Sequence, residues 1–261
     1  MEIAFGIGVG LFALTTLTYL AALWGHQEGK GTLAHWMLGG TLALWGVLLI
    51  IWATRHGVAG GNRLLLGSSA WSLGALYLVL LRRHPITALG SFVTAPATVL
   101  GMFTLLIPNP EAALMASTSD GLLVIHITLA FIGITAFTFA TAVSLLYLLQ
   151  LRLLKDKKRS ALRKKLPPLE VLDRLSLRGI VVGFPFYTLA LLLGSAFALK
   201  IGPEAGLKSA YIFAGVSWLI YGGVLQARLT AGWRGRRAAV LTAAGLILAM
   251  VVVAQYTLGF A

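Results

Sequence analysis

Residues 121–151 read GLLVIHITLAFIGITAFTFATAVSLLYLLQL and contain no Asp, Glu, Lys or Arg. A helix that crosses the hydrocarbon core of a bilayer needs about 20 mostly apolar residues, and this stretch exceeds that length. Its excess length predicts a helix that is tilted or protrudes from the bilayer. The segment therefore predicts a transmembrane helix, which means that the chain is expected to fold as an integral membrane protein.

Seven further apolar stretches meet or approach the same length, which predicts an all-α, polytopic transmembrane helix bundle of about eight spans. These stretches are Ile3–Trp24, Leu33–Ala53, Leu64–Leu81, Ile86–Ile107, Gly179–Leu199, Ser209–Leu225 and Ala238–Leu258. The first span is expected to stay in the protein, because its start carries Glu2 and no Lys or Arg, unlike a cleaved signal peptide. We expect residues 1–261 to form a single transmembrane domain.

The composition of the chain agrees with a membrane protein. Of its 261 residues, 58% are hydrophobic and 11% are charged, and the mean hydropathy is +0.88. Soluble domains usually carry about a quarter charged residues, so an ordinary soluble globule is excluded. The chain has no cysteine, which excludes disulfides, Fe–S clusters and thiolate ligation of haem. Any iron chemistry must therefore rest on histidine.

The net charge of +13 is mostly a signal of orientation. With eight spans, seventeen of the 21 Lys and Arg residues fall on one face of the membrane. The positive-inside rule predicts that this face is cytoplasmic and that both termini lie on the outer face. The four cations on the outer face are Arg55, Arg63, Lys200 and Lys208.

The one large loop, at about residues 152–178, is basic and is expected on the cytoplasmic side. We expect it to contact the anionic headgroups of the lipid bilayer, and no nucleic acid, because no stacking aromatics are interleaved with its charges. Its Lys155–Lys165 stretch is expected to extend span five as a helix that Pro167 and Pro168 end. Leu169–Leu177 is expected to lie on the inner surface as a short amphipathic segment.

Motifs for catalysis are missing from the sequence. It contains no phosphate-cradling Gly loop with Lys, no HExxH pair and no GxSxG. The eight acids all lie at or beyond span ends, whereas a proton-coupled transporter usually buries an acid at mid-membrane. We therefore expect that the protein is not an enzyme.

His126 is the strongest candidate for a binding residue. It lies clearly inside a hydrophobic run, about 7–8 Å from the outer end of its helix at 1.5 Å per residue. An ionisable group within a membrane span is costly and points to a functional site, and neutral imidazole is a common ligand of haem iron. The alternative is a structural histidine satisfied by a neighbouring Ser, Thr or backbone carbonyl.

Other outer-face residues are weaker candidates. If the short outer loop folds inward, His56 is a candidate for the second axial ligand of a haem iron. The alternative is a solvated histidine in that loop. Arg55, Arg63 and Lys208 are candidates for binding haem propionates, because Arg matches a carboxylate with two parallel hydrogen bonds. The alternative is simple pairing of the outer-face cations with the acids of that face, which are Glu111, Asp120 and Glu204.

Several residues predict how the spans pack. Trp45 and Trp71 are placed deep enough in their spans to line a cavity. Pro96 and Pro185 interrupt hydrogen-bond ladders in spans four and six, which predicts kinks that open space in the bundle. The Gly6–Gly10 pair, with its Gly-x-x-x-Gly spacing, favours close approach of another helix.

The second half of the sequence resembles a known family. The resemblance is carried by His126, Pro167-Pro168-Leu169, Asp173, Gly183-Phe184, Gly194, Lys208, Ser217-Trp218, Arg228 and the run Gly232-Trp233-Arg234-Gly235-Arg236-Arg237-Ala238-Ala239. Together these resemble the cytochrome c assembly family of multi-span membrane proteins, the CcsA/HemX-like group. The likeness is greatest to the small YpjD-like inner-membrane branch, and it covers roughly residues 91–259.

The resemblance implies haem as cofactor or cargo, a place in the inner membrane of a bacterium, and other cytochrome c maturation components as partners. It implies that His126 matches the family's outer-side haem-ligating histidine. The Trp-rich haem motif of the larger members is absent, and Gln226 and Trp45 stand where family histidines are expected. The alternatives are a small-solute permease and a non-catalytic membrane scaffold that docks a partner through its basic loop.

Overall fold

The computed structural model describes residues 2–24, 29–56, 61–83, 86–106, 121–155, 166–201 and 209–258. The helices in this part of the chain are α1 (Glu2–Trp24), α2 (Lys30–His56), α3 (Gly61–Arg83), α4 (Thr87–Leu106), α5 (Gly121–Lys155), α7 (Leu169–Ile201), α8 (Ser209–Thr230) and α9 (Arg236–Leu258). Eight helices are long and apolar enough to cross a membrane. The predicted all-α bundle of eight spans is therefore confirmed.

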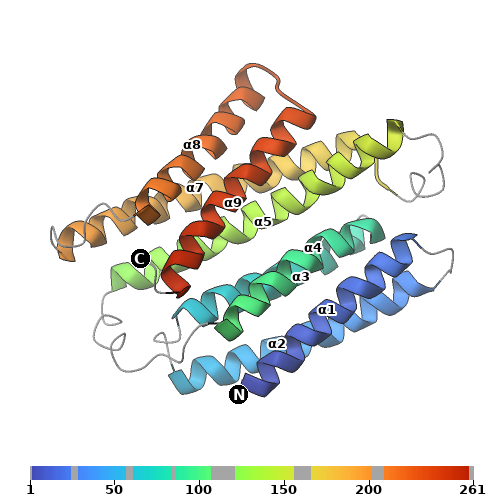
Figure 1. The fold of residues 1–261 in the computed structure, drawn as a ribbon, viewed down its shortest axis with the longest axis horizontal. Coiled ribbons are helices and arrows are strands. Elements are labelled where there is room, and N and C mark those ends of the chain that lie inside the picture. The colour runs from blue at the N-terminus through green and yellow to red at the C-terminus, as the bar shows by residue number, and fades with distance from the viewer. Residues whose placement is uncertain are drawn as a thin grey trace.

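Successive helices run in opposite directions, so the bundle has two faces (Figure 1). One face, called here the terminal face, holds the first residues of α1, α3, α5 and α8 and the last residues of α2, α4, α7 and α9. The opposite face, called the basic face, holds the end of α5 and the start of α9. The sequence placed most Lys and Arg residues on this second face.

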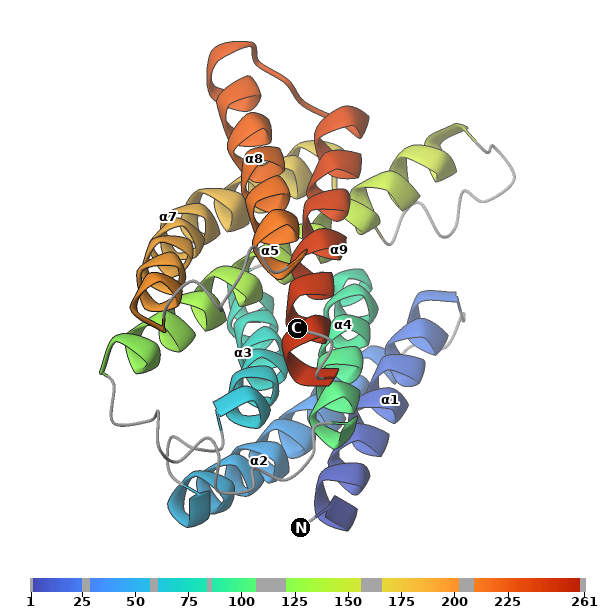
Figure 2. The same cartoon turned by 60° about the vertical axis from the view of Figure 1, so that its left-hand side comes forward.

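The helices pack as two successive four-helix rings (Figures 1 and 2). In the first ring α1 contacts α2, α2 contacts α3, α3 contacts α4, and α4 returns to α1. The second ring repeats this order with α5, α7, α8 and α9. α5 joins the rings by packing against α3 and α4. The sequence shows no repeated half, yet the same order of contacts occurs twice.

Trp45 lies at the centre of the first ring. Its side chain is fully buried, and Phe5 and Phe12 both meet its ring edge-to-face at 5.4 Å between centroids. Its indole N–H donates to the carbonyl oxygen of Gly67 across 2.9 Å. Trp45 is therefore packed and hydrogen-bonded in the core of the first ring.

Gly8 is the glycine that allows α1 to approach α2. A Cβ atom built on Gly8 would lie 2.5 Å from the Trp45 ring, whereas Gly6 and Gly10 have open space around them. The Gly-x-x-x-Gly pair is therefore not the close contact that its spacing predicted. The contact instead lies at Gly8, midway between the two glycines of the pattern, because Trp45 packs against this position.

Several helices extend beyond the predicted apolar stretches, α3 and α7 among them. α3 runs from Gly61 to Arg83, beyond the predicted stretch Leu64–Leu81, while the part apolar enough to cross a membrane is Arg63–Leu81, 19 residues long. Residues 169–177 are the first turns of the continuous helix α7 and not a separate surface segment. The reason is packing, since Leu172 and Leu175 are buried in the core and Ser176 hydrogen-bonds Ser144 on α5. Pro96 and Pro185 both lie inside continuous helices, α4 and α7.

Candidate functional site

Small residues bring α5 and α7 into close contact in the second ring. A Cβ atom on Gly133 would lie 3.1 Å from the backbone nitrogen of Tyr187, and one on Gly179 would lie 3.1 Å from the carbonyl oxygen of Ala136. Gly183 is similarly closed in by Phe137. This close approach of the two backbones brings a side chain on α5 within reach of a main-chain carbonyl on α7.

His126 is the side chain that makes this contact at the terminal face. Its Nδ1 lies 2.7 Å from the carbonyl oxygen of Ala190 on α7. A carbonyl oxygen accepts hydrogen bonds and donates none, so Nδ1 carries the proton and Nε2 of the neutral ring keeps its lone pair. A hydrogen bond from one ring nitrogen that fixes the tautomer is the usual support for a metal-ligating histidine.

Gly194 leaves room on α7 for the same imidazole ring. A Cβ atom at this position would lie 2.8 Å from Cε1 and 3.2 Å from Nδ1 of His126. The ring thus rests directly over the glycine, one helical turn beyond the carbonyl that it binds. The hydrogen bond to Ala190 and the missing side chain at Gly194 together define the position of the ring.

The neighbourhood of His126 suits one ligand position rather than a chelated metal ion. Among the described residues no group of three or more His, Cys, Asp or Glu side chains comes together. His126 is partly buried where α5 meets α7. A single imidazole whose Nε2 has no partner among the described residues fits one axial position of a haem iron, which needs no further protein ligand on that side.

Arg63 and His56 come together in the first ring, at the same terminal face. Arg63 is 3% exposed, and its Nη1 lies 2.6 Å from Oε1 of Glu2 at the start of α1. Its guanidinium lies 4.5 Å from the ring centroid of Trp52, which stacks on His56 with 3.9 Å between centroids. Nδ1 of His56 lies 3.2 Å from the carbonyl oxygen of Trp52. These four side chains form one packed cluster.

Arg55 and Lys208, the other two cations predicted to bind haem propionates, do not belong to this cluster as described. Arg55 is exposed at the last turn of α2. Lys208 lies outside the described residues, as do the three acids that the sequence offered as partners for the outer-face cations. The described partner of Arg63 is Glu2, which the sequence did not suggest. No described interaction joins His126 to His56, Arg55 or Arg63.

The structure also contains an ion pair at the basic face, between Asp173 and Arg228, that the sequence analysis did not predict. Asp173 on α7 and Arg228 on α8 lie 3.2 Å apart, and the backbone N–H of Gly235 donates to Asp173 Oδ1 across 3.5 Å. Gly235 has a positive φ of 83°, a conformation that glycine adopts without strain. The sequence did contain a clue to this unit, because Asp173, Arg228 and Gly235 are all among the residues that carry the resemblance to the cytochrome c assembly family.

These features define a polytopic helical membrane protein with a hydrogen-bonded histidine at one face of its second ring. The profile of the cytochrome C assembly protein family matches residues 64–257 of this chain. Because that match covers about three quarters of the sequence, the chain belongs to the cytochrome c assembly protein family.

Two relatives are similar over nearly their whole lengths. Protein HemX of Bacillus subtilis is 28% identical over 255 residues, which cover 92% of this chain and 89% of that protein. Cytochrome c biogenesis protein CcsA of Synechococcus sp. is 26% identical over 286 residues, with 95% and 92% coverage. CcsA of Chlamydomonas reinhardtii is 28% identical over 69% of this chain, which spans about half (52%) of that protein. No solved structure matches the chain.

Proposed function

We propose that this protein binds haem through His126 at the terminal face of its second ring and handles it in support of cytochrome c assembly. The observation that carries the proposal is the 2.7 Å hydrogen bond from His126 Nδ1 to Ala190. It holds the ring and keeps the proton on Nδ1, so that Nε2 has its lone pair for a ligand. Haem, when bound, supplies an iron that accepts this lone pair.

The remaining candidates take lower rank in the proposal. His56 is the candidate for a second axial ligand, and to serve it would have to leave its stack on Trp52. Arg55, Arg63 and Lys208 are proposed to meet the haem propionates. Arg55 is exposed and available, whereas Arg63 would have to give up Glu2.

The proposed role is binding and transfer rather than catalysis. Family membership and the missing catalytic motifs support this assignment, and other cytochrome c maturation components are its proposed partners. The charge distribution supports an orientation with the basic face in the cytoplasm, which puts His126 near the outer surface. We place the protein in the inner membrane of a bacterium, the setting that the YpjD-like resemblance implies.

Haem spectroscopy on the purified protein tests the proposal. The full chain is expressed with haem supplementation, purified in detergent, and its Soret absorbance is measured per mole of protein. His126→Gly should lose most of the Soret band, and free imidazole should restore it by occupying the vacated space. Ser195→Ala, one residue after Gly194 on α7, is the matched control and should keep the band.

Two results would contradict the assignment. One is that the unaltered protein carries no haem even after supplementation. The other is that His126→Gly retains the wild-type spectrum while His56→Ala loses it, which moves the ligand to the first ring. Flux of a small solute in proteoliposomes without any haem would instead support the permease alternative.

A further inference from the structure

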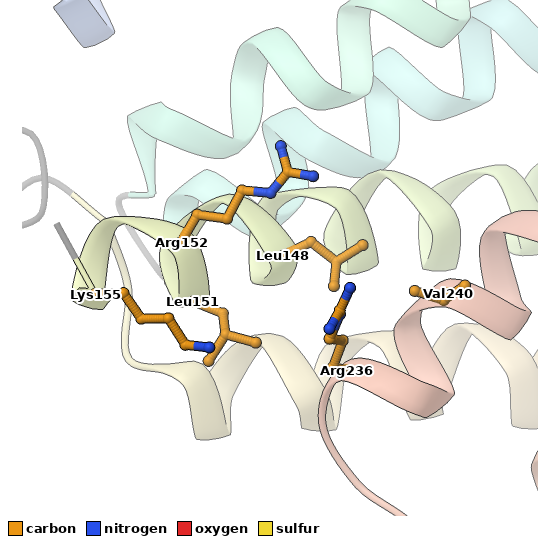
Figure 3. A pocket seen from close by; sticks show the side chains of 6 residues that line it. All are labelled: Leu148, Leu151, Arg152, Lys155, Arg236 and Val240. Atoms are coloured by element: carbon orange, nitrogen blue, oxygen red, sulfur yellow. The ribbon is translucent and has the colours of Figure 1, made fainter.

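A cavity of about 260 Å³ opens at the basic face between α5 and α9 (Figure 3). Its lining residues are Leu148, Leu151, Arg152 and Lys155 on α5 and Arg236 and Val240 on α9. It thus joins three cations to three aliphatic side chains. This combination is expected where a charged group lies at the edge of a hydrocarbon layer.

Helical spacing explains why these residues share one cavity. Positions 148, 151, 152 and 155 follow the three- and four-residue steps that line one side of a helix, and positions 236 and 240 are one turn apart. In Figure 3, Arg152 and Lys155 diverge from the last turns of α5, and Arg236 extends from the first turn of α9 toward Leu148. The cations therefore reach the cavity from two helices that are far apart in sequence.

The acids in the described part of the chain do not neutralise these cations. Only three acids are described there, and each is engaged by another arginine. Glu2 pairs with Arg63, Glu170 with Arg174 and Asp173 with Arg228. Within the described part of the chain, the cavity lining thus carries three cations and no acid, which favours an anionic occupant.

The aliphatic side chains of the cavity lining favour a lipid over a soluble anion as its occupant. Leu148 and Leu151 are partly buried, and Val240 is 47% exposed on the side of α9. A free phosphate would gain nothing from these side chains. A lipid would place its phosphate among the cations and its acyl chains along the aliphatic side chains, where burial of apolar area is favourable.

We propose that this cavity binds the headgroup of an anionic phospholipid, with the positive charges of Arg152, Lys155 and Arg236 at its rim attracting the phosphate. Basic pockets between membrane helices are suited to such headgroups, and each cation near the surface strengthens binding by about fivefold. The volume accommodates a headgroup and leaves the acyl chains on the outside of α5 and α9. This site is independent of haem binding at the opposite face.

The test compares lipid binding by two triple variants of the full chain. The cavity variant carries Arg152→Gln, Lys155→Gln and Arg236→Gln. The matched control carries Arg174→Gln, Arg178→Gln and Arg237→Gln, which removes the same charge from the same face outside this cavity. Native mass spectrometry in detergent counts bound phosphatidylglycerol and cardiolipin, with phosphatidylcholine as the uncharged reference lipid.

We expect the cavity variant to bind anionic lipid on the order of 100-fold more weakly, given about fivefold for each of three cations. The control variant should stay within about fivefold of the unaltered protein, since its cations contribute only through the general surface potential. Equal losses in both variants would overturn the site, because general surface attraction would then explain binding. Displacement of the lipid by millimolar inorganic phosphate would overturn the lipid as occupant and leave a phosphate site.

Discussion

Asp173 on α7 and Arg228 on α8 form a largely buried ion pair, with 3.2 Å between Oδ1 and Nη2. The two side chains are 16% and 3% exposed, and Nη1 of Arg228 also donates to the main-chain carbonyl oxygen of Asp173. The same carboxylate accepts the N–H of Gly235 in the turn before α9. One carboxylate thus fixes the start of α7, the end of α8 and the approach to α9.

Asp173→Asn should destabilise the protein by roughly 3 kcal/mol, because it keeps the shape of the side chain but leaves the buried charge of Arg228 uncompensated. Unfolding in mixed micelles, followed by circular dichroism, measures the change. Glu170→Gln is the control, since the Glu170–Arg174 pair is exposed and such pairs contribute about 0–1 kcal/mol. A similar loss of unfolding free energy in Asp173→Asn and Glu170→Gln would contradict the argument that burial makes the Asp173–Arg228 pair the stronger of the two.

Gly194→Ala should weaken haem binding without unfolding the protein. The new Cβ atom would lie 2.8 Å from Cε1 of His126, so the ring must move and its bond to Ala190 must lengthen. Loss of such a supporting bond typically lowers metal affinity by about 10- to 100-fold. Haem titration monitored at the Soret band measures the effect.

The matched control for this change is Gly215→Ala on α8, where a Cβ atom meets nothing within 4 Å. It should leave haem affinity unchanged. Unaltered affinity in Gly194→Ala would mean that the position of the His126 ring does not matter for binding.

Gly8→Ala should destabilise the first ring by about 1–3 kcal/mol, the usual cost of overpacking a filled core. The added methyl group would lie 2.5 Å from the ring of Trp45, which Phe5 and Phe12 hold on either side. Thermal unfolding of the detergent-solubilised protein measures the loss. Gly10→Ala, which meets open space on the same helix, should be neutral or slightly stabilising, and a loss there as large as at Gly8 would contradict the argument.

Arg63→Lys should lower stability by about 1–2 kcal/mol although it keeps the charge. The planar guanidinium stacks 4.5 Å from the Trp52 ring centroid while it binds Glu2, and an ammonium group cannot reproduce both contacts. Equilibrium unfolding measures this change. Arg55→Lys, at an exposed position of the same face, should have no measurable effect. Unchanged stability in Arg63→Lys would mean that charge alone holds the cluster together.

The number and class of the helices follow from the sequence for a simple reason. A bilayer imposes one length on every span, and this length is visible in stretches such as residues 121–151 without knowledge of any contact. The ends of helices are less constrained. The start of α7 shows this, because only the burial of Leu172 and Leu175 against other helices decides that residues 169–177 continue the span.

The candidate site could be predicted only in part. His126 is identifiable because an ionisable side chain is rare inside a span. Its acceptor Ala190 is 64 residues away, and any main-chain carbonyl on a neighbouring helix has the same chemistry. Arg63 and Glu2 are separated by 61 residues, and nothing local marks them as partners. Pairing of this kind depends on which helices meet, and sequence spacing does not contain that information.

The ring arrangement bears on how the protein is inserted during synthesis. All contacts that close the first ring, including the return of α4 to α1, involve residues before 107, so this ring can assemble before α5 has been translated. Because α1 precedes α3 in the chain, the carboxylate of Glu2 is available to pair with Arg63 as soon as α3 packs into this ring. The second ring can then form against a finished surface of α3 and α4, with the first ring acting as its template.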